Sequence, residues 1–206
     1  MLLGSSRTYR PMDRLRFIIA LGMFAVIAWA ASLPITHGWD RIVTVWLQRV
    51  APAPDVPAST LVFLGDAEIV ILGVALGAFI YLRRNRRRLA AGLWLAVGLG
   101  GASLLAVLLK HLIIHPGPPP ELQRSVLRFG LYVRTPYSFP SGHTIRTTML
   151  ARILLRRAPL VAGTLVVGMM AALIYLGDHW LSDVLGGLCL GWACTEIAEG
   201  SGKLNL

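Results

Sequence analysis

The chain has 206 residues, of which 55% are hydrophobic and 15% are charged, and its formal net charge is +10. Soluble globular domains are about 45–50% apolar and about 25% charged, so this composition excludes an ordinary soluble domain and indicates an integral membrane protein. The basic residues lie in short clusters between apolar runs, which favours anionic lipid headgroups over nucleic acid as their partners. The length fits one membrane domain over residues 1–206.

The N-terminal part of the chain predicts one membrane span followed by a helix on the membrane surface. Residues 1–16 are polar and basic, and the apolar run 17–33 is long enough to cross a bilayer. Residues 37–50 place apolar side chains, including Trp39 and Trp46, against charged ones in a helical pattern. Such a pattern is typical of an interfacial helix with its tryptophans at headgroup level.

A second span is expected over residues 59–82, with Asp66 and Glu68 near its start. Carboxylates inside a membrane are costly to place, so these two either solvate the interface or line a functional site. The basic cluster at 83–88 follows directly, and it predicts a cytoplasmic loop because such clusters are retained on the inner side.

Four further spans are expected over 89–109, 141–155, 160–176 and 181–197. The predicted fold is therefore all-α, a polytopic bundle of six transmembrane helices with one interfacial helix. The positive-inside rule places both termini in the cytoplasm. The loop 110–140 and the turn 177–182 then lie together outside, so we expect an active site on the outer face of the cell's inner or plasma membrane.

The stretch Pro140-Ser141-Gly142-His143 opens one of these apolar segments with unusually polar chemistry. Pro140 suits the first turn of a helix, because its missing N–H is one that the first turn leaves unpaired. The backbone N–H groups near Ser141 and Gly142 would then lie at the positive end of the helix, which favours a phosphate. Arg146 follows His143 by three residues and shares its helical face.

A second group of polar residues, His179 and Asp183, lies between the last two spans. Because these residues are four apart, the carboxylate can bind one ring nitrogen and leave the other free as a nucleophile. Lys110 ends the third span on the same predicted side of the membrane. These residues favour phosphoryl transfer: His179 attacks phosphorus, His143 protonates the leaving lipid oxygen, and Lys110 and arginines hold the phosphate oxygens. No ligand spacing typical of zinc is present, so we expect no metal and no cofactor.

These motifs resemble those of the type 2 phosphatidic acid phosphatase family of membrane lipid phosphatases. The family motifs are Lys-x6-Arg-Pro, Pro-Ser-Gly-His and Ser-Arg-x5-His-x3-Asp, and the likeness covers about residues 60–195. The second motif is complete at 140–143, and the third retains His179 and Asp183. The resemblance implies a phosphohistidine mechanism with His143, His179 and Asp183 as catalytic residues.

Both arginines with which the family binds phosphate are replaced here. Gly117 stands at the arginine position of the first motif, and Leu173 stands at that of the third. We hypothesise that Arg146 replaces the third-motif arginine and that one loop arginine replaces that of the first motif. The loop candidates are Arg124, Arg128 and Arg134, of which Arg134 is nearest in sequence to Ser141. The alternative is that Arg146 forms a structural ion pair with Asp66, Glu68 or Asp178.

The sequence as a whole predicts dephosphorylation of a lipid phosphate or pyrophosphate, with undecaprenyl pyrophosphate, phosphatidylglycerophosphate and phosphatidic acid as candidate substrates. The predicted substrate-binding residues are Lys110, Ser141, Gly142, Arg146 and Arg134. Two alternatives stay open: a lipid phosphotransferase that passes phosphate from His179 to a lipid hydroxyl, and a non-catalytic lipid-binding or transport protein of the same fold. The oligomeric state and the host organism do not follow from the sequence.

Overall fold

The computed structural model describes residues 11–51, 54–82, 85–126, 135–202 and 204, and every regular element in these ranges is helical. The elements are α1 (Pro11–Ala31), α2 (Pro34–Val50), α3 (Asp55–Leu64), α4 (Ala67–Leu82), α5 (Arg86–Leu112), the 3-10 turn η1 (Pro120–Leu122), α6 (Gly142–Leu154), α7 (Pro159–Tyr175) and α8 (Leu181–Gly200). The all-α prediction is confirmed.

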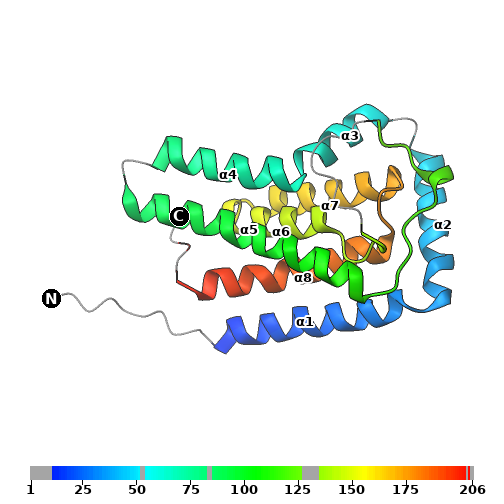
Figure 1. Cartoon of the computed structure of the whole chain (residues 1–206), viewed down its shortest axis with the longest axis horizontal. Coiled ribbons are helices and arrows are strands. Elements are labelled where there is room, and N and C mark those ends of the chain that lie inside the picture. Colours follow the sequence, from blue (N-terminus) through cyan, green and yellow to red (C-terminus); the bar gives the residue numbers. More distant parts are fainter. Residues whose placement is uncertain (1–10, 52–53, 83–84, 127–134, 203, 205–206) are drawn as a thin grey trace.

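Most of the long helices run along one direction, whereas α2 crosses one end of the bundle (Figure 1). Helix α8 packs against α1 and α6, α4 packs against α5, and α7 packs against α6 and α3. A core of buried side chains such as Leu99, Phe139 and Ile145 joins α1, α5, α6 and α8, and a second core around Leu173 joins α3 to α7.

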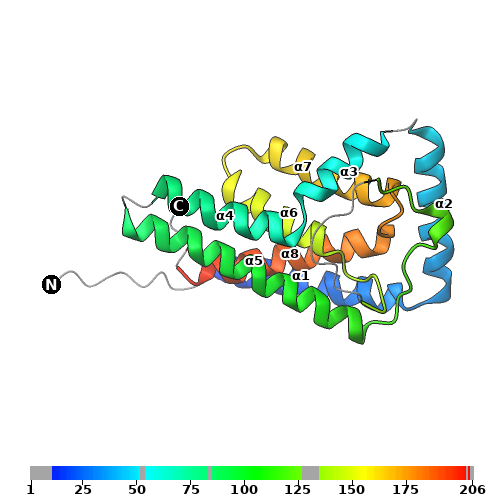
Figure 2. The same cartoon turned by 45° about the horizontal axis from the view of Figure 1, so that its top comes forward.

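The end of the bundle at which α2 lies, called the α2 end below, gathers the predicted functional segments. The last turn of α5, the first turn of α6 and the turn between α7 and α8 all lie there (Figures 1 and 2). The starts of α1 and α5 and the end of α8 lie at the opposite end in both views. Segments far apart in the sequence therefore meet at one end, as the span pattern predicts.

Three helices, α1, α5 and α8, are long and apolar enough to cross a membrane within the described part of the chain. The bent pair α3 and α4 would make a fourth span, while α7 has 17 residues and α6 has 13. The protein is an integral membrane protein. The count of six spans stays a prediction.

The predicted span over 59–82 is not one straight helix, because it is divided at Gly65 and Asp66 with a bend of 55° between α3 and α4. A Cβ added to Gly65 would lie only 2.7 Å from Met169 Cε and 3.2 Å from His143 Cδ2. The junction is therefore packed tightly between α6 and α7, where an ordinary side chain does not fit without rearrangement.

Helix α2 turns its polar face inward. Asp40 and Thr44 are buried, whereas Trp39, Ile42 and Trp46 are all more than half exposed. An amphipathic helix on a soluble protein has the opposite orientation, with its apolar face towards the core. The exposed tryptophans thus agree with the predicted location of α2 in the membrane interface.

Candidate active site

A cavity of about 700 Å³ opens at the α2 end and brings together most of the predicted site residues. Its volume is in the range of typical small-molecule sites. Its wall is formed by residues of α3, α4, α5, α6, the loop after α5 and the turn before α8. The predicted site residues that line it are Lys110, Gly142, His143, Arg146 and His179.

His179 is held by Asp183, as its spacing in the sequence predicts. The Nδ1 atom of His179 lies 3.1 Å from Asp183 Oδ2, and Asp183 has no exposed surface. The same carboxylate accepts hydrogen bonds from the Trp180 backbone N–H at 2.9 Å and from the Ser138 hydroxyl at 3.1 Å. Because Nδ1 donates to this fixed carboxylate, Nε2 is left with the lone pair that a nucleophile needs.

Behind Asp183 lies a second buried histidine, His115, which sequence reasoning did not find. Its Nε2 atom is 2.9 Å from Ser182 Oγ, 3.5 Å from Asp40 Oδ2 and 3.6 Å from Asp183 Oδ1. Asp40 in turn accepts hydrogen bonds from the backbone N–H and the hydroxyl of Ser182, at 2.9 and 2.7 Å. One imidazole thus lies between two buried carboxylates.

The two carboxylates change the proton affinity of His115. Burial acts to lower the pKa of His115, but the interaction with Asp40 and the negative charges of Asp183 and Asp40 outweigh burial and raise this pKa above its ordinary value of 6.5. A protonated His115 neutralises part of the negative charge around Asp183. This network therefore anchors the start of α8 to α2 and to the loop after α5.

Helix α6 begins at Gly142, and Ser141 is its N-cap. The Ser141 hydroxyl accepts from the Thr144 N–H at 3.4 Å, while the Ser141 N–H donates to the Asp183 carbonyl at 3.0 Å. Pro140 therefore precedes the cap, whereas the first helical turn was expected to include it. The N–H groups of Gly142 and His143 belong to the first turn, which has no preceding helical carbonyl to bind. These two groups, and not the Ser141 N–H, are available to an anion.

His143 and His179 line the same cavity, although 36 positions separate them in the sequence. Their ring centroids are 6.5 Å apart with an angle of 62° between the ring planes. A small tetrahedral group between the two rings would reach both, so one imidazole can attack phosphorus while the other exchanges a proton with the leaving oxygen.

Arg146 lies one turn into α6 and is only 5% exposed. Its Nε and Nη2 atoms donate to the carbonyl oxygen of Gly65 at 3.0 and 2.7 Å, and Nη1 lies 3.4 Å from Ser103 Oγ. A Cβ at Gly142 would lie 3.0 Å from Nη1, so the guanidinium reaches the first turn of its own helix. Lys110 and Arg146 are the cationic side chains on the cavity wall in the described part of the chain.

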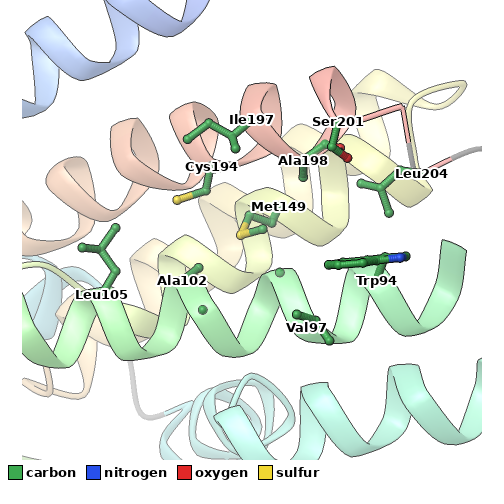
Figure 3. A pocket seen from close by; sticks show the side chains of 12 residues that line it. Trp94, Val97, Ala102, Leu105, Met149, Cys194, Ile197, Ala198, Ser201 and Leu204 are labelled. Carbon is green, nitrogen blue, oxygen red and sulfur yellow. The ribbon is translucent and has the colours of Figure 1, made fainter. Parts of the chain in front are cut away.

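A second cavity of about 270 Å³ lies between α5, α6 and α8, and Figure 3 shows its wall. The side chains that line it are almost all apolar, with Trp94 on one side and Ile197 on the other. None of the predicted site residues that the structure describes contributes to it. The predicted site residues that the structure describes therefore gather at the polar cavity of the α2 end.

Comparison with known proteins agrees with this geometry. The sequence model of the PAP2 superfamily matches residues 91–198, which is more than half of the chain. The chain belongs to the PAP2 superfamily. It is 30% identical to phosphatidylglycerophosphatase B of Bacillus subtilis over 93% of this chain and 94% of that protein. It is also 32% identical to decaprenylphosphoryl-5-phosphoribose phosphatase of Mycobacterium tuberculosis, over 70% of this chain and 78% of that protein.

A solved structure shares the fold. The crystal structure of a transmembrane PAP2-type phosphatidylglycerolphosphate phosphatase from Bacillus subtilis matches with a TM-score of 0.69 and 23% identity, over 90% of this chain and 94% of that one. The predicted family and the predicted class of enzyme, a phosphatase, are confirmed.

The two residues that stand at the PAP2 arginine positions lie in different surroundings. Gly117 lines the cavity, and Leu173 is fully buried in the apolar core between α3 and α7. Arg124, another loop arginine, stacks over the Tyr175 ring at 5.5 Å and donates to its hydroxyl, instead of lining the cavity. Arg134, predicted to bind substrate, lies outside the described residues.

The loop after α5 is anchored over the turn that carries His179. The Gln48 side-chain amide donates to the carbonyls of Leu122 and Tyr175, both at 2.8 Å. The Ser125 hydroxyl lies 2.6 Å from the Asp178 carboxylate, next to His179 in sequence. Residues 120–126 thus contact the turn that carries His179 and stabilise its position.

Proposed function

We propose that this protein removes phosphate from a lipid phosphate or pyrophosphate through a phosphohistidine intermediate on His179. One observation carries the proposal: His179, with its Nδ1 bound to Asp183, shares a cavity with His143 at a ring-centroid separation of 6.5 Å. A nucleophile with a fixed tautomer and a second proton-exchanging group are what a two-step phosphoryl transfer requires.

The proposed reaction has two steps, in each of which one bond to phosphorus forms as another breaks. In the first, His179 Nε2 forms a bond to phosphorus as the bond to the leaving oxygen breaks, and His143 gives that oxygen a proton. In the second, His143 takes a proton from water, the water oxygen attacks phosphorus, and the phosphorus–nitrogen bond breaks to release phosphate. Asp183 stabilises the positive charge that develops on His179.

The negative charge of the phosphoryl group needs cations and N–H donors around it. Lys110 and the Nη1 edge of Arg146 supply the charge, while the first turn of α6, capped by Ser141 and beginning at Gly142, supplies backbone N–H groups. In this proposal Arg146 replaces one family arginine. Arg134 stays a candidate for the other.

The substrate class follows from the relatives, because both are named for phosphate esters of membrane lipids. We therefore place phosphatidylglycerophosphate and a polyprenyl phosphoribose beside undecaprenyl pyrophosphate and phosphatidic acid as candidate substrates. The exposed arginines Arg86–Arg88 at the start of α5 support a cytoplasmic location for that end. The α2 end with its cavity would then face outward, and both termini would lie inside.

The test is phosphate release by the purified protein in detergent from a panel of these lipids, with His179→Ala as the control. The account expects release by the wild-type protein without any added acceptor and none by the variant. Transfer of phosphate only when a lipid hydroxyl is supplied would favour the phosphotransferase alternative. Lipid binding without turnover of any substrate would favour the non-catalytic one.

A further inference from the structure

The second histidine of the site also has a carboxylate partner, Asp66, which comes from a distant part of the chain. The Nε2 atom of His143 lies 2.9 Å from Asp66 Oδ1. Among the described residues, the Nδ1 atom of the same ring has no hydrogen-bond partner. His143 is thus bound on one edge of the ring, and the other edge is available.

The segment that carries Asp66 is fixed in place. Asp66 follows Gly65 at the 55° bend between α3 and α4, and the Gly65 carbonyl accepts two hydrogen bonds from the buried Arg146 guanidinium. A Cβ at Gly65 would lie 2.7 Å from the flexible end of Met169 and 3.2 Å from His143 Cδ2, so a larger residue there would displace these side chains. Asp66 therefore lies next to His143 because the backbone of this junction is bound by the arginine one turn below that histidine.

We propose that Asp66 is a positioning residue for His143. It binds Nε2 of the ring, so that Nδ1 is the nitrogen that gives a proton to the leaving oxygen and later takes one from water. This inference rests on the proposed phosphatase activity and adds a residue to it. The protein would then use two histidine–carboxylate pairs, one for the nucleophile and one for the acid and base.

The negative charge of Asp66 would stabilise the protonated form of His143. His143 must carry a positive charge before it donates its proton, although it lies among other cationic groups. Among the described residues, the charged and titratable side chains that line the cavity with it are Arg146 of its own helix, Lys110 of α5, Tyr137 of the loop before α6, His179 and Asp178 of the turn before α8, Asp66 of the α3–α4 junction and Glu68 of α4. Of these carboxylates, Asp66 is the one that hydrogen-bonds to the His143 ring, so it stabilises the imidazolium most directly.

In each step the proton on Nε2 remains shared with Asp66, while the proton on Nδ1 moves. The leaving oxygen takes the Nδ1 proton as its bond to phosphorus breaks, and His143 becomes neutral. Water later returns a proton to Nδ1 as its oxygen bonds to phosphorus, and the imidazolium–carboxylate pair is restored. Asp66 takes up no proton in either step.

The test compares Asp66→Asn with the wild-type protein on two substrates, a lipid phosphate with an alkoxide leaving group and p-nitrophenyl phosphate. A poor leaving group needs a general acid, whereas p-nitrophenolate leaves without one. We expect kcat/KM for the lipid phosphate to fall by about 10²-fold, the lower end of what general acid catalysis contributes. For p-nitrophenyl phosphate we expect a much smaller loss. We also expect the alkaline limb of the pH profile for the lipid phosphate to move to lower pH, because protonated His143 loses its proton more readily without the carboxylate.

Two control variants make the result decisive. Glu68→Gln removes a negative charge from the same cavity and is expected to leave the ratio of the two kcat/KM values unchanged. Asp66→Glu keeps the carboxylate and is expected to lose less activity on the lipid than Asp66→Asn. Equal losses on both substrates in Asp66→Asn, no loss at all, or the same selective loss in Glu68→Gln would overturn the inference. Activity towards p-nitrophenyl phosphate shows that the variant is folded. An inactive wild-type protein would instead contradict the proposed function.

Discussion

The two histidine–carboxylate pairs of this cavity differ in how firmly they are held. In the pair of His179 and Asp183, the side chains are 8% and 0% exposed, and the carboxylate accepts three hydrogen bonds, two from the turn before α8 and one from Ser138. In the pair of His143 and Asp66, the side chains are 21% and 25% exposed. A buried, fully bonded carboxylate orients its partner tightly, because moving it would leave polar groups unpaired.

This difference matches the chemistry proposed for each histidine. A nucleophile must keep one tautomer and one direction of attack, so a rigid support is an advantage. A group that gives a proton to a leaving oxygen and takes another from water needs contact with solvent. The more exposed pair is therefore suited to acid and base catalysis, and the buried pair to nucleophilic attack.

The largest expected effect comes from weakening the buried pair. Asp183→Asn removes the charge that supports His179 and can favour the wrong tautomer of its ring, so we expect kcat to fall by about 10³–10⁴-fold, as for the carboxylate of serine protease triads. Phosphate release from the lipid substrate measures it. The matched control is Asp178→Asn, a carboxylate on the same turn that binds Ser125 instead of a histidine. Similar losses of kcat in both variants would show that activity depends on the total negative charge near His179 and not on the hydrogen bond between His179 and Asp183.

Removal of the buried arginine should have the next largest effect. Arg146→Ala removes both the charge near the phosphate and the hydrogen bonds to Gly65, so we expect kcat/KM to fall by about 10²–10³-fold while the protein still folds. Arg124→Ala is the control, because that side chain stacks on Tyr175 outside the cavity. Near-normal turnover in Arg146→Ala would refute the role given to Arg146 in binding phosphate.

The smallest effect concerns the stability of the network behind Asp183. Because the pKa of His115 is raised in the folded protein, its contribution to stability is complete below its ordinary pKa of 6.5 and is lost as the pH rises through the raised value. The melting temperature in detergent should therefore fall over this range in the wild-type protein and change less in His115→Gln. His111→Gln, which alters an exposed histidine nearby, should keep the wild-type dependence. A parallel dependence in His115→Gln would contradict this account.

The sequence predicted those features that depend on short separations. Apolar runs of membrane length located the helices, and the spacing of four residues between His179 and Asp183 brought them into contact through the first turn of α8. Counting spans placed His143, Lys110 and His179 at the same end of the bundle. These inferences need only helical geometry and the fact that successive spans cross a membrane in opposite directions.

Features that depend on long-range packing were beyond the sequence. Asp40 contacts Ser182, which is 142 positions away, and its place in an amphipathic helix suggested a solvated residue. Its burial follows from the inward polar face of α2, which hydrophobic periodicity cannot distinguish from the opposite orientation. The bend at Gly65 and Asp66 was likewise hidden, because hydropathy continues through it. His115 gave no signal, since its partners come from three separate segments.

The central claim is that the phosphoryl group passes through His179, and trapping that intermediate tests it most directly. In His143→Ala, attack on p-nitrophenyl phosphate needs no acid, whereas hydrolysis of the intermediate loses its base, so the phosphorylated protein should accumulate. The measurement is mass spectrometry of peptides from the briefly reacted variant under conditions that preserve phosphohistidine. The account predicts phosphate on His179 in His143→Ala and none in a variant that also carries His179→Ala. Phosphate on another residue, or normal turnover by His179→Ala, would contradict it.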